Sequence, residues 1–284
     1  MRSALLRLFI YPNFFIATVA VMMAWETQYL NGFLDPVYLC FIFFSTLLSY
    51  SFHSIVNTVY RDVSPRHDWN YRNRKFLYVM LFISTVVCGG IFLANYLHKI
   101  IPFVVAGLLT FVYSAPNMEG RVFEFMRRIA FGKTIFLAFM WTYATTILPL
   151  WAYEPASGEL INAFTGSRFY LIYAICILFD LRDREEDRQK GIRALPTMLT
   201  DTPVRLFYFG SLAVSAFFSF MYTWPSINMT TFILMVPVII SLFMFRFTRA
   251  RDEEILYFVY LDGLMMLSAI LHAIYLFSIT FVFV

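Results

Sequence analysis

Three aspartates follow directly on an apolar segment in the second half of the chain. Asp180, Asp183 and Asp187 come after the apolar run 169–179. If helical pitch continues out of that run, the three carboxylates stand at i, i+3 and i+7 and share one helix face. Carboxylate oxygens are preferred ligands of Mg²⁺, which usually completes its shell with phosphate oxygens and waters. The spacing therefore indicates a metal–phosphate site at the water-facing end of a membrane helix.

The same stretch has a simpler interpretation as a solvated cytoplasmic loop. Basic residues are interleaved with the acids, and they are Arg182, Arg184, Arg188 and Lys190. Interleaved charges of opposite sign are typical of an exposed segment whose side chains pair with one another. On spacing alone, both interpretations stay open.

The residues beyond the aspartates extend the pattern. The sequence Asp-x-x-Asp-x-x-x-Asp at 180–187 is followed by Gly191 and by Ala-Leu-Pro at 194–196. This resembles the second aspartate-rich motif of the UbiA superfamily of intramembrane prenyltransferases. The resemblance implies one UbiA-like transmembrane domain over residues 1–284. It also implies an all-α integral membrane protein, a bundle of nine transmembrane helices with a central cavity open to the cytoplasmic side.

Composition independently indicates a membrane protein. Hydrophobic residues make up 60% of the 284 residues and charged residues only 14%, whereas soluble domains have about a quarter charged residues. Apolar runs of roughly 18–25 residues recur along the chain, which is typical of a polytopic helical membrane protein. The three cysteines, Cys40, Cys88 and Cys176, lie in apolar runs and are expected as small core residues, not disulfides or metal ligands.

Hydropathy and charge together predict a topology. The predicted spans are 8–25, 38–60, 76–97, 100–116, 129–151, 168–180, 204–223, 229–247 and 255–282. With the N-terminus in the cytoplasm, the positive-inside rule places all of the 22 lysines and arginines except Lys99 and Arg168 on the cytoplasmic side. We therefore expect a cytoplasmic N-terminus, an external C-terminus and insertion in the bacterial inner (plasma) membrane.

The end of the second span corresponds to the first motif of the same family, and here the sequence departs from it. The family pattern is Asn-Asp-x-x-Asp-x-x-x-Asp. Asn57 matches its start, but Thr58, Arg61 and Pro65 stand where the family has acids. Asn57 is either a neutral oxygen ligand or a residue that hydrogen-bonds between helices. Because a guanidinium binds phosphate bidentately, Arg61 can neutralise a diphosphate directly.

Two further acids lie close to this degenerate motif. Asp62 is displaced from it by one position, and Asp68 lies three helical turns after Asn57. Asp68 shares the Asn57 face only if the helix continues through Pro65, which removes a backbone donor. Both acids are candidate substrate-binding residues.

Two residues near the cytoplasmic ends of the fourth and fifth spans extend the resemblance. Tyr113 opens a Tyr-Ser-Ala-Pro sequence that is similar to the family's Tyr-Ser-x-Pro, and it either forms an aromatic wall or belongs to the interfacial belt. Lys133 lies inside an apolar run and either contacts diphosphate or snorkels to the interface. In the last span, Asp262 either reaches the cavity or pairs with a neighbouring helix, and His272 is expected to be structural.

The resemblance implies prenyl transfer, a transfer of alkyl groups other than methyl. A polyprenyl diphosphate binds with Mg²⁺ at the cytoplasmic mouth, and the prenyl group passes to an aromatic or lipid acceptor. The catalytic residues are then Asp180, Asp183, Asp187 and Lys133, of which the three aspartates hold the metal. The substrate-binding residues are Asn57, Arg61, Asp62, Asp68, Tyr113 and Arg193.

Two other functional classes stay open. One is a catalytically lapsed UbiA-like membrane protein that binds a prenyl or phosphate lipid, since only half of the acidic site is intact. The other is a transporter, which predicts ionisable residues near the bilayer midplane and internal repeats. The clustering of acids at one mouth disfavours a transporter. Membrane lipid is an expected partner in each case, and nucleic acid is not.

Overall fold

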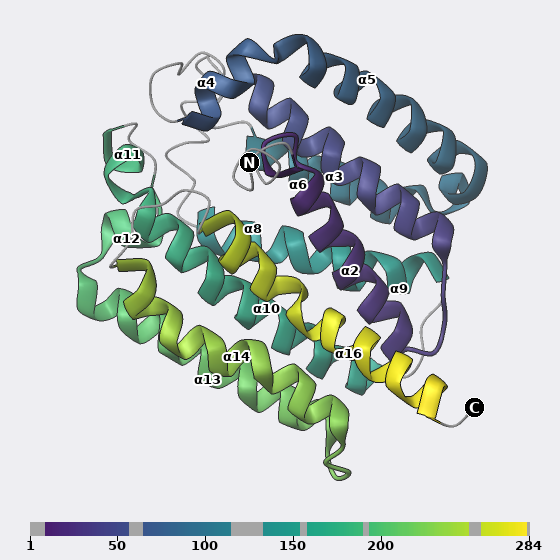
Figure 1. The fold of residues 1–284 in the computed structure, drawn as a ribbon, viewed down its shortest axis with the longest axis vertical. Helices are drawn as coiled ribbons and strands as arrows, with labels where there is room; N and C mark the ends of the chain where they lie inside the picture. Colours follow the sequence, from purple (N-terminus) through teal and green to yellow (C-terminus); the bar gives the residue numbers. More distant parts are fainter. Residues whose placement is uncertain are drawn as a thin grey trace.

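The chain is an all-helical bundle. The computed structural model describes residues 9–56, 65–114, 133–153, 158–189, 193–249 and 257–282, and no strand occurs within these ranges. The long helices lie alongside one another, as Figure 1 shows. Seven of them are long and apolar enough to cross a membrane. The prediction of an all-α membrane-type protein is therefore confirmed.

The first half of the bundle consists of α-helices with one π-helical and one 3₁₀ segment among the described residues. It contains α2 (Phe14–Leu30), α3 (Pro36–Val56), α4 (Pro65–Arg72), α5 (Arg74–Ile91), the π-helical η2 (Phe92–Tyr96), the 3₁₀ turn η3 (Leu97–Lys99) and α6 (Ile100–Ser114). The helix α3 packs against both α2 and α5. Pro65 begins α4, the position at which proline costs a helix least because the first turn has no use for its missing N–H.

The second half contributes the longest helices. It contains α8 (Lys133–Thr142), the π-helical η5 (Tyr143–Ile147), α9 (Leu148–Tyr153), α10 (Gly158–Arg182), α11 (Arg184–Gln189), α12 (Leu195–Met198), α13 (Asp201–Thr223), α14 (Met229–Arg249), the π-helical η6 (Tyr257–Leu261) and α16 (Asp262–Val282). Both α16 and α3 pack against α2, so the N-terminal helix lies between the two halves.

The helices differ from the predicted spans in number and extent. Within the described ranges there are seven candidate spans and the shorter apolar helix Phe14–Leu30, where the sequence predicts nine spans. The predicted spans 76–97 and 100–116 fall in one apolar run, Arg74–Phe111, which η2 and η3 interrupt. The predicted span 168–180 starts ten residues too late, because α10 begins at Gly158.

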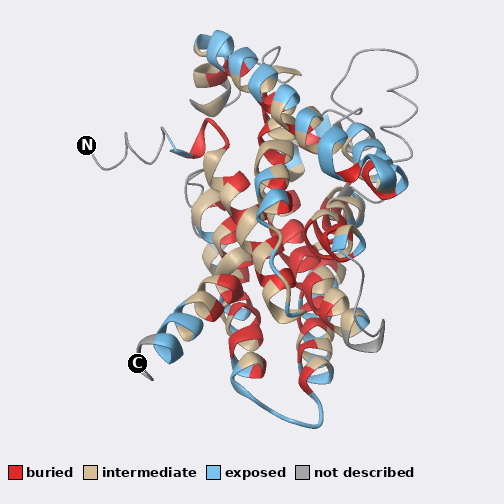
Figure 2. Cartoon of the chain, turned by 90° about the vertical axis from the view of Figure 1, so that its right-hand side faces the viewer, coloured by how far each residue is buried: buried red, intermediate tan, exposed pale blue. Residues whose placement is uncertain are grey.

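The helix α10 lies at the centre of the bundle. Every residue from Leu171 to Leu178 is buried, and a helix that is apolar on all sides is typically surrounded by others. The helices α8, α13 and α14 all pack against it. Figure 2 shows the buried residues concentrated along the middle of the bundle, with exposed residues on the outer helices. The backbone of α10 is therefore held along most of its length.

Small residues allow α10 and α13 to approach closely. The hydroxyl oxygens of Ser167 and Ser219 lie 2.6 Å apart, and the Ser215 hydroxyl donates to the Ser167 carbonyl at 2.8 Å. A Cβ added to Gly166 would lie 3.0 Å from the ring of Phe218. Small side chains and short interhelical hydrogen bonds are typical of membrane helix packing.

We expect Gly166→Ala to lower thermal stability in nanodiscs, because the added methyl group forces the Phe218 ring to move, at a cost of about 1–3 kcal/mol. Gly210→Ala on α13 is the matched control, since a Cβ there meets nothing within 4 Å. The control gains about 0.5–1 kcal/mol from helix propensity. Equal melting temperatures for the two variants would show that Gly166 does not set the helix spacing.

Candidate functional site

The three predicted aspartates lie where α10 passes into α11, a region we term the carboxylate end. Asp180 and Asp187 are buried, with 3% and 4% of their surface exposed, whereas the Asp183 side chain is 31% exposed. Asp183 forms a bend between the two helices, so the predicted single helix is interrupted there. Backbone hydrogen bonds still cross the bend, from Asp183 to Phe179 at 3.0 Å and from Asp187 to Asp183 at 2.8 Å. The three carboxylates therefore come from about two turns of nearly continuous helix.

Asp180 connects the carboxylate end to α8. The Thr134 hydroxyl donates a hydrogen bond to Oδ2 of Asp180, and both side chains are buried. A buried carboxylate needs such a donor, since it has lost its hydration. Lys133 opens α8 one residue before Thr134, so its backbone is close to Asp180, while its side chain lies outside the described part of the structure.

The interleaved arginines pair with acids, as the loop interpretation expects. Arg182 binds both oxygens of Asp183, at 2.7 and 3.2 Å. Arg184 pairs with Asp201 at 2.7 Å and also donates to the carbonyl oxygens of Pro196 and Leu199. Arg184 thereby fixes the segment after α11 against the start of α13. Arg182 and Arg184 are thus paired with acids, as the loop interpretation expects, but the contacts of Arg184 also hold the chain around it against the neighbouring helix α13.

A second group of charges lies near the carboxylate end. The guanidinium groups of Arg66 on α4 and Arg182 on α10 both lie over the ring of Phe258, at 4.5 and 5.4 Å from its centroid. Asp262 at the start of α16 is buried and lies within electrostatic range of both arginines. We term Arg66 and Arg182 the arginine pair. Aromatic stacking holds two cations close together here.

Asn13 adds a buried donor beside the arginine pair. Its Oδ1 accepts a hydrogen bond from Arg66 at 2.7 Å. Its Nδ2 is buried and has no hydrogen-bond partner. An unpaired buried N–H donor costs free energy unless a further acceptor binds it. Because Arg66 and Asn13 both supply donors, this place favours a ligand rich in acceptor oxygens.

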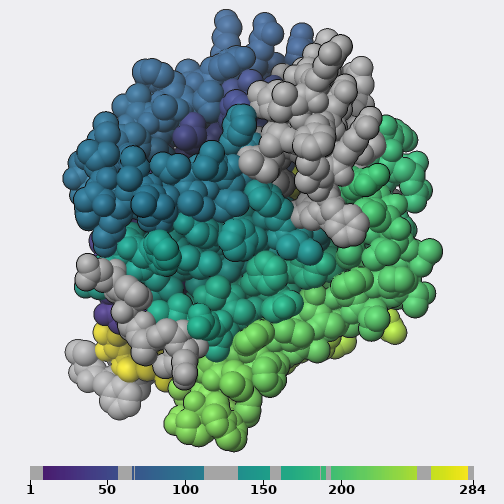
Figure 3. Space-filling view, turned by 180° about the vertical axis from the view of Figure 1, so that it is seen from behind, coloured from purple at the N-terminus to yellow at the C-terminus, as the bar shows by residue number. Residues whose placement is uncertain are grey.

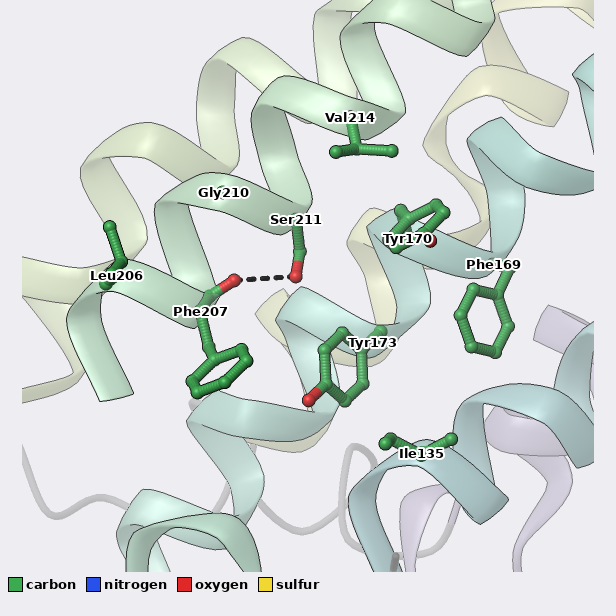
Figure 4. Close-up of a pocket in the computed structure, with 9 residues that line it drawn as sticks. All are labelled: Ile135, Phe169, Tyr170, Tyr173, Leu206, Phe207, Gly210, Ser211 and Val214. Atoms are coloured by element: carbon green, nitrogen blue, oxygen red, sulfur yellow. Dashed lines mark hydrogen bonds between the residues drawn. The ribbon is translucent and has the colours of Figure 1, made fainter. Parts of the chain in front are cut away.

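An aromatic pocket of about 430 Å³ lies between α8, α10 and α13. Figure 4 shows its side chains around the space between the three helices. In the space-filling view the surfaces of α8, α10 and α13 adjoin on one face of the bundle (Figure 3). The lining residues are Ile135, Phe169, Tyr170, Tyr173, Leu206, Phe207, Gly210, Ser211 and Val214. Its size and apolar walls are typical of a site for a hydrophobic ligand.

The aromatic pocket is connected to the carboxylate end through two residues. Ile135 lines the pocket and directly follows Thr134, which binds Asp180. Tyr173 also lines the pocket and lies within electrostatic range of Asp180 on the same helix. A charged region and an apolar pocket therefore adjoin, which suits an amphipathic ligand.

The carboxylate end fits Mg²⁺ in the chemistry of its donors, because carboxylate oxygens are what this ion prefers. No group of three Asp, Glu, His or Cys side chains close enough to hold a metal ion occurs in the part of the chain that the structure describes. Magnesium is commonly bound by one or two carboxylates together with phosphate oxygens and waters. As the described side chains lie, no more than two of Asp180, Asp183 and Asp187 could share one Mg²⁺, and phosphate oxygens and waters would have to complete its shell.

Three of the predicted substrate-binding residues fall in one gap. Asn57, Arg61 and Asp62 lie outside the described residues, between the end of α3 at Val56 and the start of α4 at Pro65. Their predicted roles stay predictions.

The other predicted binding residues are at least partly described. Asp68 lies on α4 and pairs with Arg72 at 3.0 Å, with its side chain 41% exposed. Tyr113 is in the last turn of α6, but its side chain lies outside the described part. Arg193 is exposed in the segment before α12.

Sequence reasoning missed the most deeply buried charges. Glu26 lies one residue beyond the predicted span 8–25, but α2 extends to Leu30 and buries it completely. Arg168, expected at the external surface, is buried and paired with Glu26. A charged residue beside an apolar run is the signal that identifies such positions.

Comparison with known proteins gives no family assignment. No family model, no curated protein and no solved structure matches this chain. Function is therefore inferred from the geometry of the site and from the motif resemblance.

We expect Thr134→Val to lower the free energy of unfolding by about 1–3 kcal/mol, because it leaves the buried Asp180 carboxylate without this donor. Thr134→Ser keeps the hydroxyl and is the control. Thermal unfolding in nanodiscs measures the difference. If valine and serine variants melt together, the Thr134 hydroxyl does not support Asp180.

Proposed function

We propose that the chain is an intramembrane prenyltransferase of the UbiA type, which moves a polyprenyl group from a prenyl diphosphate to a hydrophobic acceptor. One observation carries the proposal: the carboxylate end and the aromatic pocket adjoin through Thr134, Ile135 and Tyr173. A prenyl diphosphate has a strongly charged head on an apolar tail, so it matches this arrangement in both parts.

The diphosphate head of the proposed substrate has two kinds of binding partner. Asp180, Asp183 and Asp187 are the residues that would offer oxygen ligands to Mg²⁺, and the ion would supply neutralising charge to the diphosphate. Arg66 and the unpaired Nδ2 of Asn13 supply donors for phosphate oxygens. Both kinds of contact stabilise the negative charge that grows on the departing diphosphate. Lys133, at the start of α8, belongs to the same proposal.

The tail of the substrate lies in the aromatic pocket. Phe169, Tyr170 and Tyr173 form one wall, and Phe207 lies on the opposite helix. Loss of diphosphate from an allylic carbon leaves a carbocation, which water would trap as an alcohol. Aromatic faces attract a cation and exclude water. The 34 phenylalanines and 18 tyrosines of the chain make such walls plentiful.

The membrane setting follows from the seven apolar helices. With the N-terminus cytoplasmic and the C-terminus external, the carboxylate end faces the cytoplasm. The bacterial inner membrane and the nine-helix count with a cytoplasmic cavity belong to the same proposal. The positive-inside distribution of lysine and arginine supports the proposed orientation.

A catalytically lapsed lipid-binding protein is the second candidate. The observation that favours it is the pairing of Arg182 with both oxygens of Asp183, which neutralises a carboxylate that the metal would use. A lapsed protein binds the prenyl diphosphate but releases no diphosphate when an acceptor is present. Turnover therefore separates the two candidates.

We expect a prenyl diphosphate with Mg²⁺ to stabilise the native chain in nanodiscs by about 2.7 kcal/mol at a concentration of 100 times Kd, because it binds the folded state alone. Asp183→Asn should abolish the Mg²⁺-dependent part of this stabilisation. Glu185→Gln is the matched control, since its carboxylate is exposed and pairs only with Arg188 among the described contacts. If no prenyl diphosphate of any prenyl length stabilises the folded native protein, both the enzyme proposal and the binding proposal are overturned.

We expect Gly210→Leu to weaken stabilisation by long-chain prenyl diphosphates at least tenfold in apparent Kd, because the leucine side chain fills the aromatic pocket. Stabilisation by inorganic diphosphate should be unchanged, since the head site is untouched. Gly107→Leu on α6 is the control, because a Cβ at either glycine meets nothing within 4 Å. If both leucine variants lose the same affinity for long-chain prenyl diphosphates, the aromatic pocket does not bind the prenyl tail.

A further inference from the structure

A second polar cluster is buried in the bundle, and it joins three helices. It consists of Glu26 on α2, Arg168 on α10, and Ser268 and His272 on α16, with exposed fractions of 0%, 6%, 6% and 1%. Glu26 accepts hydrogen bonds from Arg168, from the Ser268 hydroxyl at 2.9 Å and from Nδ1 of His272 at 2.8 Å. We term these four residues the Glu26 cluster.

The Glu26 cluster is separate from the proposed prenyl site. Arg168 and Asp180 are twelve residues apart on the continuous helix α10. At 1.5 Å per residue this places them about 18 Å apart along the axis. Glu26 is only four residues from the end of α2 at Leu30. The cluster therefore lies toward the opposite end of the bundle, and its role does not depend on prenyl transfer.

The charge of Arg168 is fully accounted for within the cluster. One of its terminal nitrogens pairs with Glu26, and the other donates to the Met23 carbonyl at 2.8 Å and to the Thr27 hydroxyl at 2.6 Å. The same nitrogen also approaches Thr146 Oγ1 at 3.1 Å, and the guanidinium lies over the Phe164 ring at 4.6 Å. Arg168 and Glu26 thus form a neutral pair in which both terminal guanidinium nitrogens donate hydrogen bonds.

His272 is the member of the cluster with unused bonding capacity. Because a carboxylate can only accept, its partner Nδ1 carries the proton, and in the neutral imidazole Nε2 then has a lone pair. This Nε2 is buried and has no hydrogen-bond partner. The side chain is 1% exposed, so only a very small ligand can reach it. A carboxylate holding one imidazole nitrogen leaves the other poised to take up a proton, which is the common arrangement of histidine bases.

The groups around His272 define its electrostatic surroundings. Besides the Glu26 cluster, the ring of Tyr29 on α2 lies 5.8 Å away, and Tyr222 on α13 lies within electrostatic range of Glu26 and Arg168. Other charged or titratable residues described on the elements that pack against α16, and on α16 itself, are Arg246, Arg249, Tyr257, Tyr260, Asp262 and Tyr275. Glu26 is therefore the anion in direct contact with the imidazole.

We propose that the Glu26 cluster is an intramembrane proton-binding site, in which His272 takes up one proton at Nε2. Protonation converts the imidazole into an imidazolium whose positive charge faces the Glu26 carboxylate, and the net charge of the cluster changes from zero to plus one. The proton enters from the end at which α2 terminates, since Glu26 is about one turn from Leu30.

The test is the protonation state of each histidine in the full chain. The protein is labelled with ¹⁵N-histidine, reconstituted in nanodiscs and followed by NMR from pH 8 to pH 5. The chain has four histidines, and His272→Gln identifies the relevant signal by its loss. His98→Gln, which removes a histidine outside the cluster, is the matched control. If His272→Gln does not fold, the dipolar contact of the imidazole with the Tyr29 ring assigns the signal instead.

The expected result is that Nδ1 of His272 stays protonated at every pH, while Nε2 changes reversibly from bare to protonated as the pH falls. The spectrum loses this titrating signal in His272→Gln and keeps it in His98→Gln. A Nε2 that stays bare down to pH 5, or that is already protonated at pH 8, overturns the proposal. So does a bare Nδ1, because Glu26 would then not hold the imidazole as the structure indicates.

Discussion

The buried ion pair between Glu26 and Arg168 is the constraint on which the bundle most depends. Moving two charges out of water costs several kcal/mol per ion, and their attraction offsets this only when every remaining donor and acceptor is satisfied. Thr27, Ser268 and backbone carbonyls provide those partners. The π-helical segment η5 contributes as well, because its altered hydrogen bonding leaves the Thr145 carbonyl to accept from the Thr27 hydroxyl at 2.8 Å. The ion pair and its hydrogen-bond partners thus connect α2, α10, α16 and η5.

The helix α10 transmits this constraint to the candidate site. Its apolar middle, Leu171 to Leu178, is buried on all sides, so the helix can neither rotate nor slide without losing packing. Arg168 fixes one end and Asp180 lies at the other. The hydrogen bond from the Thr134 hydroxyl to Asp180 then fixes the start of α8 relative to α10. The carboxylate end, the aromatic pocket and Lys133 are consequently arranged around one rigid helix.

The sequence predicts the long helices well, because apolar runs of membrane length have few alternatives in lipid. It predicts the boundaries poorly where a charge is compensated from far along the chain. The sequence pattern predicts Arg168 at the water-facing start of a span. In the structure it is buried, because its partner Glu26, 142 residues earlier in the chain, neutralises its charge. The motif at Asp180–Asp187 predicts where acids gather, but not the bend at Asp183 or its pairing with Arg182. Neither the arginine pair nor the aromatic pocket could be read from spacing, because each assembles residues from helices distant in sequence.

The pairing of Asp183 with Arg182 bears on how a diphosphate and a metal ion would arrive. As described, Arg182 holds both oxygens of Asp183 and lies over Tyr257 and Phe258. A diphosphate carries more negative charge than a carboxylate, so under the proposed function it would compete for Arg182 and Arg66 and leave Asp183 available as a ligand. Under the proposed function, diphosphate therefore creates the carboxylate site that Mg²⁺ needs, and the two bind together. Under the same proposal, the two arginines would take over part of the charge neutralisation that acids and metal would otherwise provide.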